Sequence, residues 1–148
     1  MIRPATPADA PTIARHRYPD EAAAAERPIY AAWVADALTR GIYLGFLAVT
    51  DGGEVVAGAG LILLEWGPGR GDPQPYRARV VNVWTHPDYR RQGLARELVV
   101  LCLQAAQERG LPLVSLGTSE MGRPLYEALG FRANGTEMMW RGPSSKGE

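Results

Sequence analysis

The fold is decided by residues 86–96, whose sequence is HPDYRRQGLAR. They follow the apolar run Val80–Trp84 and lead into Leu94–Arg109, in which apolar residues recur every three to four positions. This order predicts a turn from a strand into a helix. The first turn of a helix has about four backbone N–H groups without partners inside the helix, and the helix dipole makes that end positive. We therefore expect residues 86–96 to bind an anion.

Individual residues of this stretch favour the same interpretation. Gly93 lets the main chain come close to a bound group, and Arg90, Arg91 and Arg96 add positive charge. The whole chain carries 16 basic and 16 acidic residues, which removes any general argument for binding nucleic acid or an anionic membrane. A small anionic ligand therefore fits better than a long polyanion.

Length and composition indicate a single domain over residues 1–148, with a flexible tail at 142–148. A chain of this size buries about two-thirds of its unfolded surface without metals or disulfides. The only cysteine, Cys102, lies in the apolar pattern of a helix, so we interpret it as a buried thiol and not as a nucleophile. The sequence shows no apolar leader and no run near the roughly 18 apolar residues that a membrane helix needs, so we expect a soluble, cytoplasmic protein.

Hydrophobic periodicity predicts alternating strands and helices. Asn134-Gly135 predicts a final hairpin, whereas Gly58 and Gly60 predict a bulge or a place of close packing. Residues 66–76 form a long loop, and a substrate lid and a plain mobile insertion both remain open for it. The expected strands are 2–5, 42–49, 54–64, 76–85 and 113–116, with a hairpin over 131–140, and the expected helices are 6–17, 28–38, 93–109 and 121–129.

Two motifs in this order resemble a known family. Arg90-x-x-Gly93-x-Ala95 follows a strand, and Leu125–Phe131, LYEALGF, comes later in the chain. Together they resemble the GCN5-related N-acetyltransferase (GNAT) superfamily. The resemblance implies a three-layer αβα fold of the α+β class. Its mixed, mostly antiparallel sheet has six to seven strands, with about four helices and with the fourth and fifth strands parallel and splayed. It also implies an N-acetyltransferase, an acyltransferase that uses acetyl-CoA as co-substrate and no metal.

The same resemblance implies where acetyl-CoA binds. The pantetheine arm would pair with the backbone of Val83–Thr85, and the pyrophosphate would lie on the amides of the loop that follows. Ser119 stands where many family members have an asparagine that contacts the pantetheine, so we expect a hydroxyl contact there. The expected cofactor-binding residues are Val83, Trp84, Thr85, Arg90, Arg91, Gln92, Gly93, Leu94, Ala95, Arg96, Ser119 and Tyr126.

Catalysis would need a donor for the oxyanion, a proton for the departing thiolate and an uncharged amine. The backbone N–H of Val83 or Trp84 is the expected oxyanion donor. By resemblance Tyr126 is the general acid, since a phenol with an unperturbed pKa of about 10 stays protonated at neutral pH; simple packing of Tyr126 is the alternative. Asn82 lies near a position where some family members carry a glutamate, and an amide is no base. The base remains open among Glu65, Asp20, Glu21, Glu120 and His86, and the amine can also arrive neutral.

The acceptor is expected to be a primary amine of a small molecule or a peptide. Tyr30, Trp33, Glu65 and Trp66 are its expected contacts, although the spacing of Tyr30 and Trp33 also fits core packing. Family members are often dimers, so a homodimer is one expected assembly. Two alternatives remain: a non-catalytic acetyl-CoA- or CoA-binding sensor or interaction domain, and an unrelated α/β domain whose loop binds another phosphate.

Overall fold

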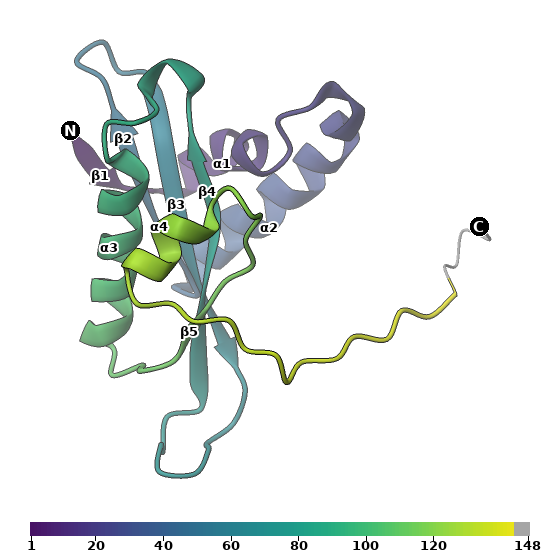
Figure 1. The fold of residues 1–148 in the computed structure, drawn as a ribbon. Coiled ribbons are helices and arrows are strands. Elements are labelled where there is room, and N and C mark those ends of the chain that lie inside the picture. Colours follow the sequence, from purple (N-terminus) through teal and green to yellow (C-terminus); the bar gives the residue numbers. More distant parts are fainter. Residues whose placement is uncertain (144–148) are drawn as a thin grey trace. The chain divides into compact units, whose positions relative to one another are not determined.

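The computed structural model describes residues 1–143. The chain divides into two compact units, Met1–Gly117 and a second that begins at Thr118. The first unit contains one five-stranded sheet in the order β1-β2-β3-β4-β5, in which β5 is parallel to β4 and the other pairs are antiparallel (Figure 1). The strands are β1 (Ile2–Pro4), β2 (Tyr43–Val49), β3 (Val55–Glu65), β4 (Tyr76–Thr85) and β5 (Val114–Ser115).

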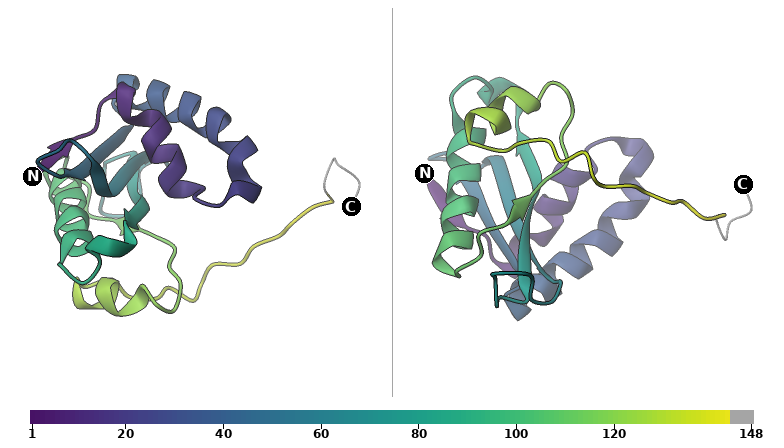
Figure 2. Two further views of the ribbon diagram at one scale, coloured as in Figure 1. Left: turned by 90° about the horizontal axis from the view of Figure 1, so that it is seen from above. Right: turned by 60° about the horizontal axis from the view of Figure 1, so that its bottom comes forward.

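Helices cover both faces of this sheet, so the first unit has the expected three layers (Figure 2). Helices α1 (Ala10–Arg17) and α2 (Arg27–Arg40) pack on one face, and α3 (Leu94–Glu108) packs on the other. Asp9 fixes the start of α1, because its carboxylate accepts hydrogen bonds from the backbone of Thr6 and the guanidinium of Arg3 at 2.8 Å. No described helix has the length and apolar character needed to cross a membrane.

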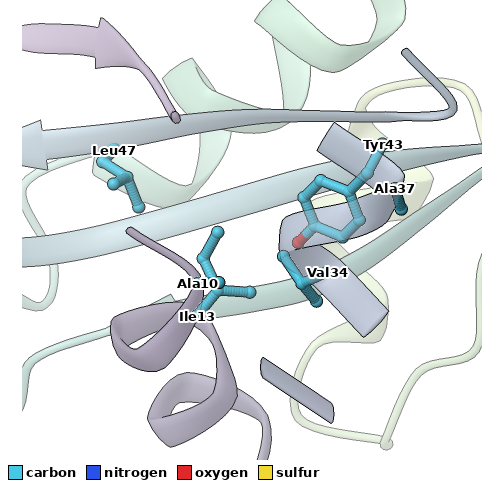
Figure 3. Packing of buried hydrophobic residues seen from close by; sticks show 6 residues of the cluster. All are labelled: Ala10, Ile13, Val34, Ala37, Tyr43 and Leu47. Atoms are coloured by element: carbon cyan, nitrogen blue, oxygen red, sulfur yellow. The ribbon is translucent and has the colours of Figure 1, made fainter. Parts of the chain in front are cut away.

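The hydrophobic core lies on both faces of the sheet. Between the sheet and helices α1 and α2, the ring of Tyr43 packs beside Val34 and Ala37, and Ile13 and Leu47 extend the cluster (Figure 3). Under α3, Cys102 is fully buried, as expected, and burial raises the pKa of its thiol to about 12. Cys102 is therefore a core residue with a protonated thiol at neutral pH.

Strands β4 and β5 are parallel, as expected, but they pair only at Ala78 with Val114 and at Arg79 with Ser115. From Val80 to Thr85, β4 has no register partner in β5. This half of β4 therefore offers backbone groups on the β5 side to a ligand that lies along it.

A β-bulge interrupts β4. Gly60 pairs with Val81 and Gly58 pairs with Trp84, so two residues of β4, Asn82 and Val83, lie opposite one residue of β3. Asn82 has a φ of 56°, in the left-handed region that asparagine tolerates better than most residues. The bulge expected from the two glycines is confirmed.

Gly58 and Gly60 also make room for aromatic rings, which confirms the expected close packing. A Cβ at Gly60 would lie 2.9 Å from Cε1 of Tyr43, and a Cβ at Gly58 would lie 3.1 Å from Nδ1 of His16. Real Cβ atoms are almost never closer than 3.0 Å to another heavy atom. The side chains of Tyr43 and His16 therefore cross the face of β3 at the two positions where glycine leaves that strand without a side chain.

The second unit contains α4 (Arg123–Ala128). The prediction of six to seven strands is wrong, because the described chain has five and residues 131–140 form no hairpin. The turn itself forms locally, since Oδ1 of Asn134 accepts a hydrogen bond from the backbone N–H of Thr136. The flanking residues have no strand to pair with, and Met138 is 95% exposed. Of the expected tail at 142–148, residues 144–148 lie outside the described residues.

Candidate functional site

The loop between β4 and α3 has a specific backbone shape. His86 is a turn residue, because its Nδ1 accepts a hydrogen bond from the backbone N–H of Asp88 at 3.1 Å. Two residues then adopt the left-handed conformation, Arg91 with a φ of 65° and Gly93 with a φ of 79°. Gly93 is the residue at which α3 begins, and its carbonyl accepts the first helical hydrogen bond, from Glu97. Gly93 therefore has the left-handed conformation directly before the first amides of α3.

These amides form an anion-binding surface. Among the described residues, none accepts a hydrogen bond from the backbone N–H groups of residues 91–96. The side chains of Arg90, Arg91 and Arg96 are exposed, and no carboxylate of the described residues lies within 4 Å of their guanidinium nitrogens. Consecutive N–H donors, a helix N-terminus and three cations fit a phosphate or pyrophosphate group.

The bulge brings Asn82 into a polar network. Nδ2 of Asn82 donates hydrogen bonds to the hydroxyl groups of Tyr30 at 2.8 Å and Tyr43 at 2.9 Å. Oδ1 of Asn82 accepts a hydrogen bond from Nη1 of Arg17 at 3.2 Å. The amide is therefore fully engaged, and the sheet at this point is tied to both α1 and α2.

Aromatic groups surround this network. His16 of α1 stacks on Trp84 with ring centroids 4.2 Å apart, and Tyr30 stacks on Trp33 at 5.8 Å. Burial, together with the charge of Arg15, lowers the pKa of His16 to about 4, so its imidazole is neutral at pH 7. The structure thus brings the predicted acceptor residues Tyr30 and Trp33 to the bulge of β4. Tyr30 also packs against the core cluster, as the core-packing interpretation expects, and its contact with an acceptor stays a prediction.

Glu65 and Trp66 lie at the opposite end of the sheet. Glu65 pairs with Tyr76, the first residue of β4, whereas Val83 is seven residues further on, a distance of about 23 Å along a strand. Trp66 is 65% exposed, and its ring lies against the guanidinium of Arg77 at 5.4 Å. The structure therefore does not bring these two predicted acceptor residues to Val83.

In the second unit, Tyr126 and Ser119 lie on either side of Gly122. A Cβ added to Gly122 would be 3.3 Å from Cε2 of Tyr126 and 3.8 Å from Oγ of Ser119. The ring of Phe131 contacts the ring of Tyr126 edge to face, with centroids 5.9 Å apart. The LYEALGF motif thus places its tyrosine on α4 and fixes it with its own final phenylalanine.

The candidate bases are all solvent-facing or engaged. Asp20 is exposed, Glu21 lies 3.6 Å from Arg27, and Glu120 lies 3.9 Å from Arg123. In the part of the chain that the structure describes, no group of three His, Cys, Asp or Glu side chains is arranged to hold a metal ion.

Arg17 is the site residue that the sequence did not reveal. It reaches Asn82, which is 65 positions away, and its guanidinium lies 4.8 Å from the centroid of the Tyr30 ring. No motif marks it, and the only local signal is a basic residue at the end of a predicted helix. The hint for the network as a whole was Gly60, which indicated that some side chain crosses β3.

Comparisons with known proteins agree with this geometry. The chain is 35% identical over 101 residues to a mycothiol acetyltransferase from Thermomonospora curvata, a match that covers 66% of this chain but only 31% of that protein. A crystal structure of a GCN5-related N-acetyltransferase from Ralstonia eutropha is 30% identical with a TM-score of 0.85, covering 95% of this chain and 97% of the other. A predicted acetyltransferase from Clostridium acetobutylicum, crystallised with acetyl-CoA, shares the fold with a TM-score of 0.86 at 18% identity and 95% coverage of both chains.

The family model of the acetyltransferase (GNAT) family matches residues 9–131, which include the β4–α3 loop and the LYEALGF motif. This match spans well over half of the 148 residues. The chain therefore belongs to the acetyltransferase (GNAT) family.

Proposed function

We propose that the protein transfers the acetyl group of acetyl-CoA directly to a primary amine of a small molecule or a peptide. The observation that carries this proposal is the run of backbone N–H groups at residues 91–96, directly after a half of β4 that has no β5 partner. The first feature suits the pyrophosphate of acetyl-CoA. The second suits an extended arm that pairs with a strand edge.

In this proposal the pyrophosphate binds the amides of Arg91–Arg96, with Arg90 adding charge, and the pantetheine arm pairs with Val83–Thr85. Arg91 and Gly93 support this, because left-handed residues within a loop are typical of runs of backbone N–H groups that bind an anion. Ser119 and Tyr126 are proposed contacts of the pantetheine and the thiol sulfur, on the strength of the family motif. The family match extends across both compact units, which supports one acetyltransferase domain over residues 1–148.

For the chemistry, we assign the backbone N–H of Val83 to the oxyanion, because the bulge leaves Val83 without a register partner in β3. Tyr126 donates the proton to the departing thiolate. Asn82 donates two hydrogen bonds through its amide nitrogen and accepts one at its oxygen, so it holds the bulge and does not act as a base. The amine enters neutral or loses its proton to water.

The acceptor site in this proposal lies at Tyr30 and Trp33. Trp33 is 37% exposed and stacks on Tyr30, so an aromatic surface reaches solvent beside the bulge. The similar Thermomonospora protein is named for a small-molecule thiol, which supports a small-molecule acceptor here. Glu65 and Trp66 are left out of the proposed site, because they lie at the other end of β4.

A second candidate is a CoA-binding sensor without turnover, and the amide of Asn82 in place of an acid favours it. Release of free thiol from acetyl-CoA, measured over a panel of amines for the wild type and Tyr126→Phe, separates the two. Amine-dependent thiol release that falls at least tenfold in Tyr126→Phe supports the transferase with this general acid. Binding of CoA without thiol release for any amine supports the sensor, and unaltered turnover in Tyr126→Phe contradicts the role of Tyr126.

A further inference from the structure

At the proposed acceptor site, Arg17 is a cation without a carboxylate partner among residues 1–143. Its Nε donates a hydrogen bond to the hydroxyl of Tyr18 at 3.2 Å, and its Nη1 donates one to Oδ1 of Asn82 at 3.2 Å. Its guanidinium also lies over the rings of Tyr18 and Tyr30, at 5.6 and 4.8 Å from their centroids. All of these partners are neutral, so the positive charge is held in place without being compensated.

Arg17 shares the lack of a carboxylate partner with Arg90, Arg91 and Arg96, but among the described residues no side-chain hydrogen bond or ring contact holds those three. Several other arginines are neutralised. Arg3, Arg40 and Arg123 each form an ion pair with Asp9, Asp36 and Glu127 respectively, at 2.8, 2.6 and 3.2 Å. For Arg17, no carboxylate of residues 1–143 lies within 4 Å of a guanidinium nitrogen. The side chain is nevertheless exposed, so a ligand has access to it.

The position of this charge is close to the proposed chemistry. Arg17 binds Asn82, and Asn82 precedes Val83, whose backbone N–H we assign to the oxyanion. Tyr30, a proposed acceptor contact, touches both the guanidinium and the ring of Trp33. A guanidinium that is fixed by two hydrogen bonds and two rings has lost much of its rotational freedom before it meets a ligand.

We infer that Arg17 is a specificity residue that binds an oxyanion, carboxylate or phosphate, on the acceptor, so that the preferred substrates are amines that carry such a group. The inference rests on the proposed acetyl transfer at the same site. Guanidinium groups bind both kinds of oxyanion through paired N–H donors. An amino acid or an amino phosphate fits this chemistry, whereas a simple alkylamine offers Arg17 no anionic group and a polyamine brings further positive charge to it.

The test uses matched pairs of amines that differ in the anionic group: β-alanine with β-alaninamide, and phosphoethanolamine with ethanolamine. For each amine, kcat/KM and the calorimetric Kd in the presence of CoA are measured for the wild type, Arg17→Gln and Arg17→Lys. Arg15→Gln is the matched control, because Arg15 is exposed on the same helix and, among described residues, its side chain hydrogen-bonds only Thr12 and not Asn82 or the tyrosines.

We expect the wild type to prefer at least one anionic amine over its neutral partner. In Arg17→Gln, kcat/KM for that anionic amine falls by about 10- to 100-fold, as loss of a charged hydrogen bond implies, while the value for the neutral partner changes less than about threefold. Arg17→Lys recovers part of the loss, and Arg15→Gln leaves both values unchanged. The two pairs also distinguish a carboxylate from a phosphate as the group that is bound.

Equal losses on anionic and neutral amines in Arg17→Gln overturn the inference, because they assign Arg17 to holding Asn82 alone. Wild-type preference for the neutral partner in both pairs overturns it as well. Binding that is selective for anionic amines and lost in Arg17→Gln, but without turnover of any amine, supports the anion site and contradicts the acetyl transfer. Absence of both binding and turnover contradicts both.

Discussion

Replacing Asn82 by alanine tests whether the network at the bulge stabilises the sheet. The change removes the hydrogen bonds from Nδ2 to the hydroxyls of Tyr30 and Tyr43, each of which contributes about 1 kcal/mol net. An alanine at a φ of 56° costs about 1 kcal/mol more, because the left-handed conformation brings Cβ against the next carbonyl oxygen. We therefore expect the free energy of unfolding to fall by about 3 kcal/mol in Asn82→Ala.

Urea unfolding followed by tryptophan fluorescence measures this loss directly, and thermal unfolding should show a midpoint lower by about 6–12 °C. Asn82→Asp is the matched control. Aspartate has the same shape, tolerates the left-handed conformation, and accepts hydrogen bonds from both tyrosine hydroxyls once these rotate. We expect Asn82→Asp to lose less than about 1 kcal/mol, with help from the charge of Arg17.

Tyr43→Phe, alone and combined with Asn82→Ala, completes a double-mutant cycle. Tyr43 is 1% exposed, so its hydroxyl depends on Asn82 for its hydrogen bond, and we expect a coupling of about 1 kcal/mol between the two positions. Strictly additive losses would contradict the proposed network. So would an Asn82→Ala protein within about 0.5 kcal/mol of the wild type, the range typical of surface substitutions.

Three further outcomes follow from the structure. Gly93→Val should weaken CoA binding at least tenfold by calorimetry. Gly53→Val is its control, because Gly53 has a similar φ of 88° and equally open surroundings but lies outside the loop. It should lower the free energy of unfolding by a similar amount, about 1–2 kcal/mol, and leave CoA binding unchanged. Between pH 6.5 and about 4 the unfolded chain binds a proton at His16 that the folded chain does not, so stability should fall by up to about 1.4 kcal/mol for each pH unit below 6.5. Subtracting the pH dependence of the stability of His16→Phe from that of the wild type isolates the contribution of His16. It separates this contribution from that of Asp9, whose pKa is lowered by Arg3 and whose stabilising effect is lost only as the pH falls below the ordinary pKa of an aspartate. Gly60→Ala should lower the free energy of unfolding by more than about 2 kcal/mol because the new methyl group meets the Tyr43 ring, whereas Gly52→Ala, whose nearest atom is 3.8 Å away, should have little effect by denaturant titration.

Much of the fold is encoded in local signals and was predictable. Strand β4 was expected at 76–85 and has these bounds, because an apolar run between two turn-rich segments defines both ends. Helix α2 was expected at 28–38 and runs from Arg27 to Arg40, where Gly41 caps it in the left-handed conformation typical of helix ends. The final hairpin failed because Asn134-Gly135 specifies a turn, while a strand pair also needs a neighbouring sheet edge that the sequence does not reveal.

The candidate site was predictable where its residues are adjacent in the sequence, and not where they come from different elements. The β4–α3 loop consists of adjacent residues, so its glycine, arginines and helix start could be found together in the sequence. The network at Asn82 combines side chains of α1, α2 and β2, and these meet only after the helices pack on the sheet. Glu65 was predicted to contact the acceptor beside an unusual loop, and the sequence could not show that it lies opposite Tyr76, at the end of β4 far from Val83.

The bulge also determines the facing of every residue after it in β4. Val81 packs toward α1 and α2, and so do the two side chains of Asn82 and Trp84, although strict alternation from Val81 would place those two on the α3 side. One extra residue therefore reverses the face of the sheet to which each later side chain of β4 points. Loss of a single residue between Val81 and Trp84 would restore regular pairing and keep Trp84 opposite Gly58, on the side of His16, but the one residue left between them would face α3, away from Tyr30 and Tyr43. The length of this strand, counted to one residue, is thus as much a determinant of the acceptor surface as the identity of any side chain in it.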